Sequence, residues 1–209
     1  MNSKVTHINV GNLAENCWFL ANEDTKEAVV IDPGAEPDRI CAAAEKHGWK
    51  ITAILLTHGH IDHMGACESL RTELGVKVYA LTEEEDLLLD AKKNLSVFIE
   101  RKVVTFEPDE LLRDGQELTL AGMKIQVIHT PGHTPGGCSY YVADAGCVFS
   151  GDTLFAESVG RSDFPGGSTS ALVRAVKEKL FLLPDDTLVC PGHGEETTIG
   201  HEKKYNPFV

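Results

Sequence analysis

Short apolar runs, separated by polar turns rich in glycine and proline, recur along this chain and are typical of β-strands. The first half has such runs at residues 5–10, 17–20, 28–31, 51–57 and 76–80. Between them, apolar positions recur at helical spacing over residues 36–47 and 65–74, which predicts two helices. Strand and helix therefore alternate, and the pattern predicts the α/β class.

The second half repeats the strand pattern with fewer helices. Further strands are expected at residues 117–120, 123–128, 137–142, 147–150 and 187–190. The first two of these form a hairpin across Ala121-Gly122, and a helix is expected from Ser168 to before Pro184. No linker or low-complexity segment divides the two halves, so we expect one domain over residues 1–209.

Residues 82–101 are expected to be helical, opened by a capping pair between Thr82 and Glu85. The acidic run Glu83-Glu84-Glu85-Asp86 is interpreted as a solvated helix start, where the helix dipole favours carboxylates. Apolar residues in this stretch exceed what a single buried stripe requires. They indicate either core packing or the wall of a substrate pocket.

The chemistry of the chain is concentrated in Thr57-His58-Gly59-His60-Ile61-Asp62-His63, directly after an apolar run. Side chains alternate along an extended segment, so His58 and His60 project to the same side and can bind one ion together. Asp62 and His63 follow where the chain turns towards a helix, and they can face a second ion. Imidazole and carboxylate are ligands of zinc, manganese or iron, and this segment itself contains no cysteine to supply a thiolate.

Three later strands end in turns that present the same residue types. These turns carry His133 after Pro131-Gly132, Asp152 between Gly151 and Thr153, and His193 after Pro191-Gly192. The candidate metal ligands are thus His58, His60, Asp62, His63, His133, Asp152 and His193. They are too many for one tetrahedral zinc ion and suit two ions that share a carboxylate, a centre that produces hydroxide at neutral pH. A GxSxG motif, which would indicate a serine hydrolase, is absent from the sequence.

Two further residues near these turns have uses that the sequence leaves open. Asp32, in Asp32-Pro33-Gly34, either stabilises its own turn or orients a metal ligand. His129 lies within an expected strand and is interpreted as a structural histidine.

Composition narrows the classes of partner. The formal net charge of −13 argues against a nucleic-acid partner, and no apolar run is long enough to span a membrane. The six cysteines form no CxxC pair, and the N-terminus lacks an apolar signal region, so we expect reduced thiols and a cytoplasmic location. A small-molecule substrate is expected, and monomer and homodimer remain open.

The segments THGHIDH, TPGHT, GDT and PGHG, in this order, resemble the metallo-β-lactamase superfamily. The resemblance runs from the first strands to the C-terminus and implies a four-layer αββα sandwich with a dimetal site at one edge, between its two sheets. The family pattern implies that one ion is held by His58, His60 and His133. It implies that the other is held by Asp62, His63 and His193, with Asp152 bridging the two.

Within this superfamily, Gly160-Arg161-Ser162-Asp163-Phe164 resembles the short glyoxalase II-like hydrolases and also the persulfide dioxygenases. The C-terminal segment PGHGEETTIGHEKKYNPF is more similar to the hydrolases. The resemblance implies a thioesterase that cleaves a hydroxyacyl-glutathione such as S-D-lactoylglutathione, with two divalent ions, zinc expected and iron or manganese as alternatives. Asp62 and Asp152 are the expected catalytic residues. Arg161 either binds a substrate carboxylate or pairs with Asp163.

Two departures from full-length glyoxalase II concern glutathione. The chain ends at Val209, soon after His193, without the helical region that binds glutathione there, and Gly192–Thr197 replaces the usual GHEYT segment. The alternatives to a thioesterase are a persulfide dioxygenase with a single iron and a lactonase or other ester hydrolase of the same fold.

Overall fold

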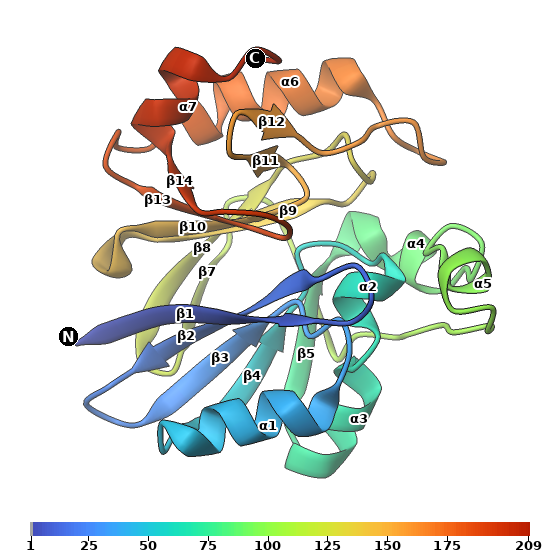
Figure 1. The fold of residues 1–209 in the computed structure, drawn as a ribbon, viewed down its shortest axis with the longest axis vertical. Coiled ribbons are helices and arrows are strands. Elements are labelled where there is room, and N and C mark those ends of the chain that lie inside the picture. The colour runs from blue at the N-terminus through green and yellow to red at the C-terminus, as the bar shows by residue number, and fades with distance from the viewer. Residues whose placement is uncertain (1) are drawn as a thin grey trace.

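Two six-stranded sheets lie face to face in the computed structural model, which describes residues 2–209 (Figure 1). Helices α1 and α3 cover the outer face of the first sheet, and α6 and α7 cover the outer face of the second (Figure 1). The predicted four-layer αββα sandwich is therefore confirmed.

The first sheet is built from the N-terminal half of the chain. Its strands, in spatial order, are β1 (Ser3–Val10), β2 (Glu15–Asn22), β3 (Glu27–Ile31), β4 (Lys50–Leu55), β5 (Lys77–Leu81) and β6 (Glu110–Leu112). The pairs from β3 to β6 are parallel, and α1 (Pro37–Lys46) and α3 (Cys67–Leu74) connect successive parallel strands. Parallel neighbours need such crossover helices, so the alternation in the sequence correctly predicted this half.

The second sheet is built from the C-terminal half and is mostly antiparallel. Its order is β14 (Thr197–Thr198), β13 (Leu188–Pro191), β10 (Cys147–Gly151), β9 (Cys138–Val142), β8 (Met123–His129) and β7 (Glu117–Leu120). The parallel pair β10 and β13 is connected through a small hairpin, β11 (Leu154–Phe155) and β12 (Ser158–Val159), and through α6 (Thr169–Glu178). Helix α7 (Ile199–Tyr205) follows β14.

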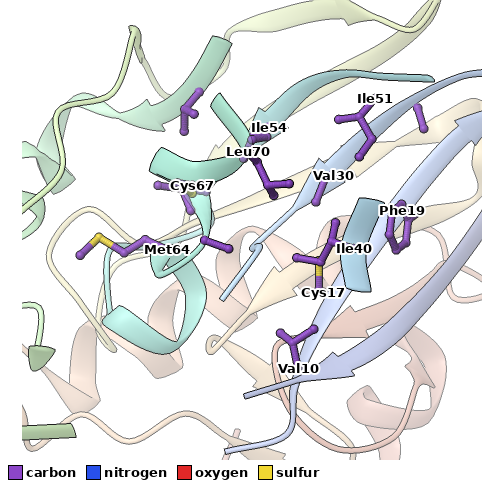
Figure 2. Close-up of a cluster of buried hydrophobic side chains, with 14 of the residues drawn as sticks. Val10, Cys17, Phe19, Val30, Ile40, Ile51, Ile54, Met64, Cys67 and Leu70 are labelled. Atoms are coloured by element: carbon purple, nitrogen blue, oxygen red, sulfur yellow. The ribbon is translucent and has the colours of Figure 1, made fainter. Parts of the chain in front are cut away.

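Alternation along the central strands divides the apolar side chains between two cores. In β3, Val29 and Ile31 face the space between the sheets, while Val30 packs with Ile40 of α1 in the outer cluster. Figure 2 shows that outer cluster, where Leu70 of α3 also points at the sheet. Each fully buried side chain of this size contributes about 1.5–3 kcal/mol, so both faces of the first sheet are held by burial.

The expected helix over residues 82–101 is wrong. The segment contains only a 3₁₀ turn (Thr82–Glu84), α4 (Glu85–Leu88) and α5 (Ser96–Ile99), and the capping pair is not formed because the Thr82 hydroxyl donates to the Leu112 carbonyl. The side chains of Asp90 and Asn94 accept hydrogen bonds from backbone N–H groups two residues on. Such local bonds compete with helical ones and break the helix.

Several short elements were not predicted from the sequence. They are β6, the β11–β12 hairpin, β14, α7, the four-residue α2 (Ile61–Met64) and the 3₁₀ turn Ala143–Ala145. Most are too short to show a period, whereas α7 does carry a signal that was overlooked. The Thr198 hydroxyl accepts from the His201 N–H at 3.2 Å, a regular helix N-cap. The helix expected from Ser168 to before Pro184 ends earlier, at Glu178, and a 3₁₀ turn (Leu180–Leu182) follows it.

The six cysteines are all free thiols, and each except Cys41 is buried, as expected for reduced residues. Residues 2–209 include no helix with the length and apolar character that a bilayer crossing demands.

Tyr140→Phe tests the contact between the sheets. The buried Tyr140 hydroxyl of β9 donates to the Leu56 carbonyl at the end of β4, at 2.7 Å. We expect the variant to lower the free energy of unfolding by about 1–2 kcal/mol in urea denaturation, because a buried carbonyl loses its strong donor. Tyr141→Phe is the matched control, since this half-buried neighbour makes no such bond; equal stability of both variants would contradict the assignment.

Candidate metal centre

The histidine loop leaves the end of β4 and is fixed by Asp32 at the end of β3. One carboxylate oxygen of Asp32 accepts from the Thr57 N–H at 2.7 Å, and the other accepts from the Thr57 hydroxyl at 2.5 Å. The second oxygen also lies 3.1 Å from Nδ1 of His63. Of the two uses considered for Asp32, the orientation of a metal-ligand candidate is therefore the one that these contacts support.

The first group of candidate ligands comprises His58, His60 and His133, all buried. Their ligand atoms lie within 4.8 Å of one another, and His133 Nε2 is 2.9 Å from His60 Nδ1. The other ring nitrogen of His133 donates to the backbone carbonyl of Arg161 at 2.6 Å, which fixes its orientation.

The second group comprises Asp62, His63 and His193, which also lie within 4.8 Å of one another. Asp62 and His63 stand on α2, and His193 follows β13. Asp62 Oδ2 lies 3.3 Å from His193 Nε2 and 3.7 Å from His63 Nε2. The three side chains thus converge from two loops that are distant in sequence.

Asp152 lies between the two groups. Its Oδ2 is 3.5 Å from His133 Nε2 of the first group, and its Oδ1 is 3.5 Å from His63 Nε2 of the second. The structure therefore brings all seven predicted ligands together, and Asp152 has the position that a bridging carboxylate requires.

Several buried polar atoms in this cluster have no hydrogen-bond partner within the described chain. They are Nε2 of His58, Nε2 of His60, Nε2 of His63 and Oδ1 of Asp152. Such orphaned atoms are costly and rare unless something else binds them. Because the donor set is imidazole and carboxylate without thiolate, it suits zinc, iron or manganese, and the residues present fit divalent ions.

Burial tunes the first group for metal binding. Desolvation, reinforced by the neighbouring imidazoles, lowers the pKa of His58 well below its usual value and lowers the pKa of His60 to about 3. Burial also lowers the pKa of His133, against the opposing effect of Asp152. These rings are neutral at physiological pH, and neutral imidazole is the form that binds metals.

The second group is dominated by ion pairing. Burial acts to lower the pKa of His63, but the carboxylates of Asp152, Asp62 and Asp32 outweigh it and raise the pKa. Burial acts to raise the pKa of Asp62, but His63 and His193 outweigh it and lower the pKa. Without a cation, a proton on His63 offsets part of the carboxylate charge, so metal binding here releases that proton.

Glycines allow the loops to approach this closely. A Cβ on Gly34 would lie 1.6 Å from the Asp62 carbonyl oxygen, and one on Gly192 would lie 2.4 Å from Asp152 Oδ1. The Asp32-Pro33-Gly34 and Pro191-Gly192 turns therefore need glycine for steric reasons.

Glu84 corrects the interpretation of the acidic run as solvated. Its side chain is buried, and its carboxylate accepts from the N–H groups of Gly59 and Gly136, each at 2.8 Å. These two glycines flank the ligand candidates of separate loops, so one carboxylate ties both loops together. Burial raises the pKa of Glu84 to about 7, against the lowering effect of these backbone bonds. Nothing in the run itself distinguishes Glu84 from its neighbours.

Glu15 is a second buried acid that the sequence did not reveal. Both of its carboxyl oxygens lack a hydrogen-bond partner within the described residues, and Oε1 lies 3.9 Å from Nδ1 of His63. Burial raises its pKa well above the usual value, with His63 opposing. Burial therefore favours the neutral form of this carboxyl group.

The two remaining predictions concern Arg161 and His129. Arg161 donates to both carboxylate oxygens of Asp163, at 2.9 and 2.8 Å, so the local ion pair is formed. A ring nitrogen of His129 lies 2.8 Å from the Pro135 carbonyl, away from the cluster, which agrees with a structural role.

Comparison with known proteins places the chain in a family. The sequence pattern of the metallo-beta-lactamase superfamily matches residues 10–193, and the chain belongs to this superfamily, as a metallo-hydrolase. Hydroxyacylglutathione hydrolase GloC of Haemophilus influenzae is 36% identical over 197 residues, which cover 93% of this chain and 92% of that protein.

Two solved structures are similar along the whole chain. BLEG-1, a B3 metallo-beta-lactamase, is 39% identical with a TM-score of 0.93, and the match covers 98% of this chain and 99% of BLEG-1. TTHA1623 in a di-iron-bound form is 37% identical with a TM-score of 0.86, and the match covers 98% and 100% of the two chains.

Glu84→Gln tests the carboxylate that ties the loops. Because the pKa of Glu84 rises from 4.5 to about 7 on folding, its contribution to stability is full below pH 4.5 and is lost as pH rises through 7. In chelator-treated protein, we expect the free energy of unfolding of the wild type to fall by roughly 3 kcal/mol more than that of the variant over this range. The exposed neighbour variant Glu83→Gln should follow the wild type; parallel curves for all three proteins would contradict the assignment.

Proposed function

We propose that this chain is a glyoxalase II-type thioesterase that cleaves a hydroxyacyl-glutathione thioester such as S-D-lactoylglutathione. The observation that carries the proposal is the position of Asp152 between two groups of side chains that could each hold a metal ion. His58, His60 and His133 would hold one divalent ion, and Asp62, His63 and His193 the other. Zinc is the proposed metal, with iron supported by the di-iron form of the similar TTHA1623.

Divalent ions held by these residues would lower the pKa of a water and polarise a carbonyl oxygen. The side chains of this protein then have the tasks of holding and moving a proton. Asp152, between the groups, would orient the attacking water. Asp62, which like Asp152 has an oxygen within 4 Å of His193 Nε2, would accept a proton. Asp32 and the Arg161 carbonyl keep His63 and His133 in the orientation that this arrangement needs.

The reaction breaks the carbon–sulfur bond of the thioester, adds hydroxyl to the acyl carbon and releases a carboxylate, a thiol and a proton. A thiol has a pKa of about 8.5, so the thiolate can leave without a proton from a general acid. The cluster accordingly contains carboxylates and histidines but no separate residue placed as a general acid. The similarity to GloC of Haemophilus influenzae supports the choice of substrate.

Hydrolysis of a β-lactam is a second candidate, supported by the similarity to BLEG-1 over nearly the whole chain. A single-iron persulfide dioxygenase is less well supported. Such an enzyme would bind its iron through the first group and Asp152. The convergence of Asp62, His63 and His193 would then have no function in metal binding.

The direct test is thiol release from S-D-lactoylglutathione by zinc-loaded protein, with chelator-treated protein as control. We expect turnover only in the loaded protein, at least a hundredfold above the control. Metal-dependent opening of a β-lactam without thiol release would overturn the thioesterase proposal in favour of the second candidate.

Asp152→Ala should abolish turnover and lower the metal content measured by elemental analysis, because the carboxylate between the groups is removed. The circular dichroism spectrum should match that of the wild type, since the Asp152 side chain is not part of a hydrophobic core. Asp86→Ala, on the exposed part of the acidic run, should keep full activity and metal content. A fully active Asp152→Ala enzyme would refute the bridging assignment.

A further inference from the structure

A cavity of about 600 Å³ opens over the metal-ligand cluster, and its outer wall is apolar. The wall consists of Leu13, Leu95, Phe98, Ile99, Phe155 and Phe164. His60, Asp62, His133 and Asp152 line the same cavity. A molecule whose reacting carbonyl lies at the cluster must therefore place the rest of its structure against these apolar side chains.

Three of the wall residues expose apolar surface to water, which is unfavourable. Phe98 is 67% exposed, Leu13 is 50% exposed and Ile99 is 38% exposed. Exposed apolar patches of this kind mark binding sites, since burying them against a ligand recovers the hydrophobic stabilisation that folding left unused.

Buried polar contacts fix this wall in place. The Asn94 side chain donates to the Val104 carbonyl at 2.8 Å. The Asn94 backbone carbonyl accepts from the N–H of Ile61, the residue directly after His60, at 2.9 Å. Leu95 has a φ of 67°, a left-handed conformation that costs roughly 1 kcal/mol or more for a residue with a side chain. The segment that carries Leu95 and Phe98 is thus anchored to the histidine loop.

The cavity offers no free positive side chain to a charged substrate. Arg161 is the one lysine or arginine among its lining residues in the described chain, and both oxygens of Asp163 already accept from it. The Arg161 guanidinium also lies 4.4 Å from the centre of the Phe164 ring. An anionic group on the part of a substrate that lies against the wall, away from the ions that the cluster would hold, would find no free cationic side chain among the lining residues.

We propose that the preferred substrates are thioesters with an uncharged apolar group, alkyl or aryl, next to the reacting carbonyl, and that this group packs against Leu13, Phe98 and Ile99. The proposal rests on the proposed thioesterase function for the reacting bond, and the balance of the hydrolysis is unchanged. S-D-Lactoylglutathione, with a small hydroxylated acyl group and a charged thiol, uses little of this wall. It remains an expected substrate of the thioesterase, but thioesters with an apolar group should bind more tightly.

Binding of non-hydrolysable analogues tests the inference separately from turnover. The probes are ketones in which CH₂ replaces the thioester sulfur, titrated by calorimetry into zinc-loaded and chelator-treated protein. One arm extends the acyl side from acetyl to hexanoyl on an N-acetylcysteamine-like portion, and the other keeps acetyl and extends the thiol side to hexyl. We expect affinity to rise about fourfold per added CH₂ group in one arm, which identifies the side of the thioester that packs against the wall.

Phe98→Ser should lower the affinity for the longest analogue of that arm by about tenfold and leave the acetyl analogue of the acyl arm unchanged. Val103→Ser is the matched control, because Val103 is 81% exposed close to α5 but lies outside the cavity wall. The control should bind all analogues as the wild type does.

The possible outcomes separate the two proposals. Equal affinity for short and long analogues in both arms overturns the inference, whether or not thioesters are hydrolysed. Length-dependent binding without hydrolysis of any thioester supports the inference about the wall and overturns the thioesterase function. A change of oligomeric state in Phe98→Ser, with unchanged affinities, would show that the patch is a contact between copies of the chain and would also overturn the inference.

Discussion

Desolvation of imidazoles and carboxylates at one edge of the sandwich is the constraint on which the rest of this structure depends. Ring nitrogens of His58, His60 and His63 are buried without partners in the described chain, and Asp152 shares this condition. Such atoms destabilise a fold unless a cation binds them. The fold tolerates the cost because two packed cores, one between the sheets and one under α1 and α3, stabilise the strands that end there.

The strand ends and two buried carboxylates hold the side chains of this cluster in fixed positions. The ligand candidates stand at the ends of β4, β8, β10 and β13, so rigid strands from both sheets set their positions. Asp32 fixes the histidine loop through Thr57, and Glu84 joins that loop to the one that carries His133. Neither carboxylate needs to touch an ion in order to determine where the imidazoles point.

Strand and helix periodicity predicted the α/β class, and the resemblance to the metallo-β-lactamase superfamily predicted the four layers. The histidine and aspartate motifs predicted the residues that converge, because each motif is local in sequence. Glu84 could not be predicted, since its burial depends on Gly59 and Gly136 reaching it from other loops. Glu15 was likewise hidden within an ordinary strand. The helix expected over residues 82–101 failed because side-chain bonds from Asp90 and Asn94 competed with helical ones. The non-helical course of this segment also places Leu95, Phe98 and Ile99 in the apolar wall of the cavity.

The central claim is that the two groups of side chains are two ion sites joined by Asp152. Anomalous diffraction from crystals grown with zinc tests this claim most directly. The account predicts two peaks per chain, one among His58, His60 and His133 and one among Asp62, His63 and His193, with Asp152 in contact with both. A single peak at full occupancy, with the second group still hydrogen-bonded to itself, would contradict it.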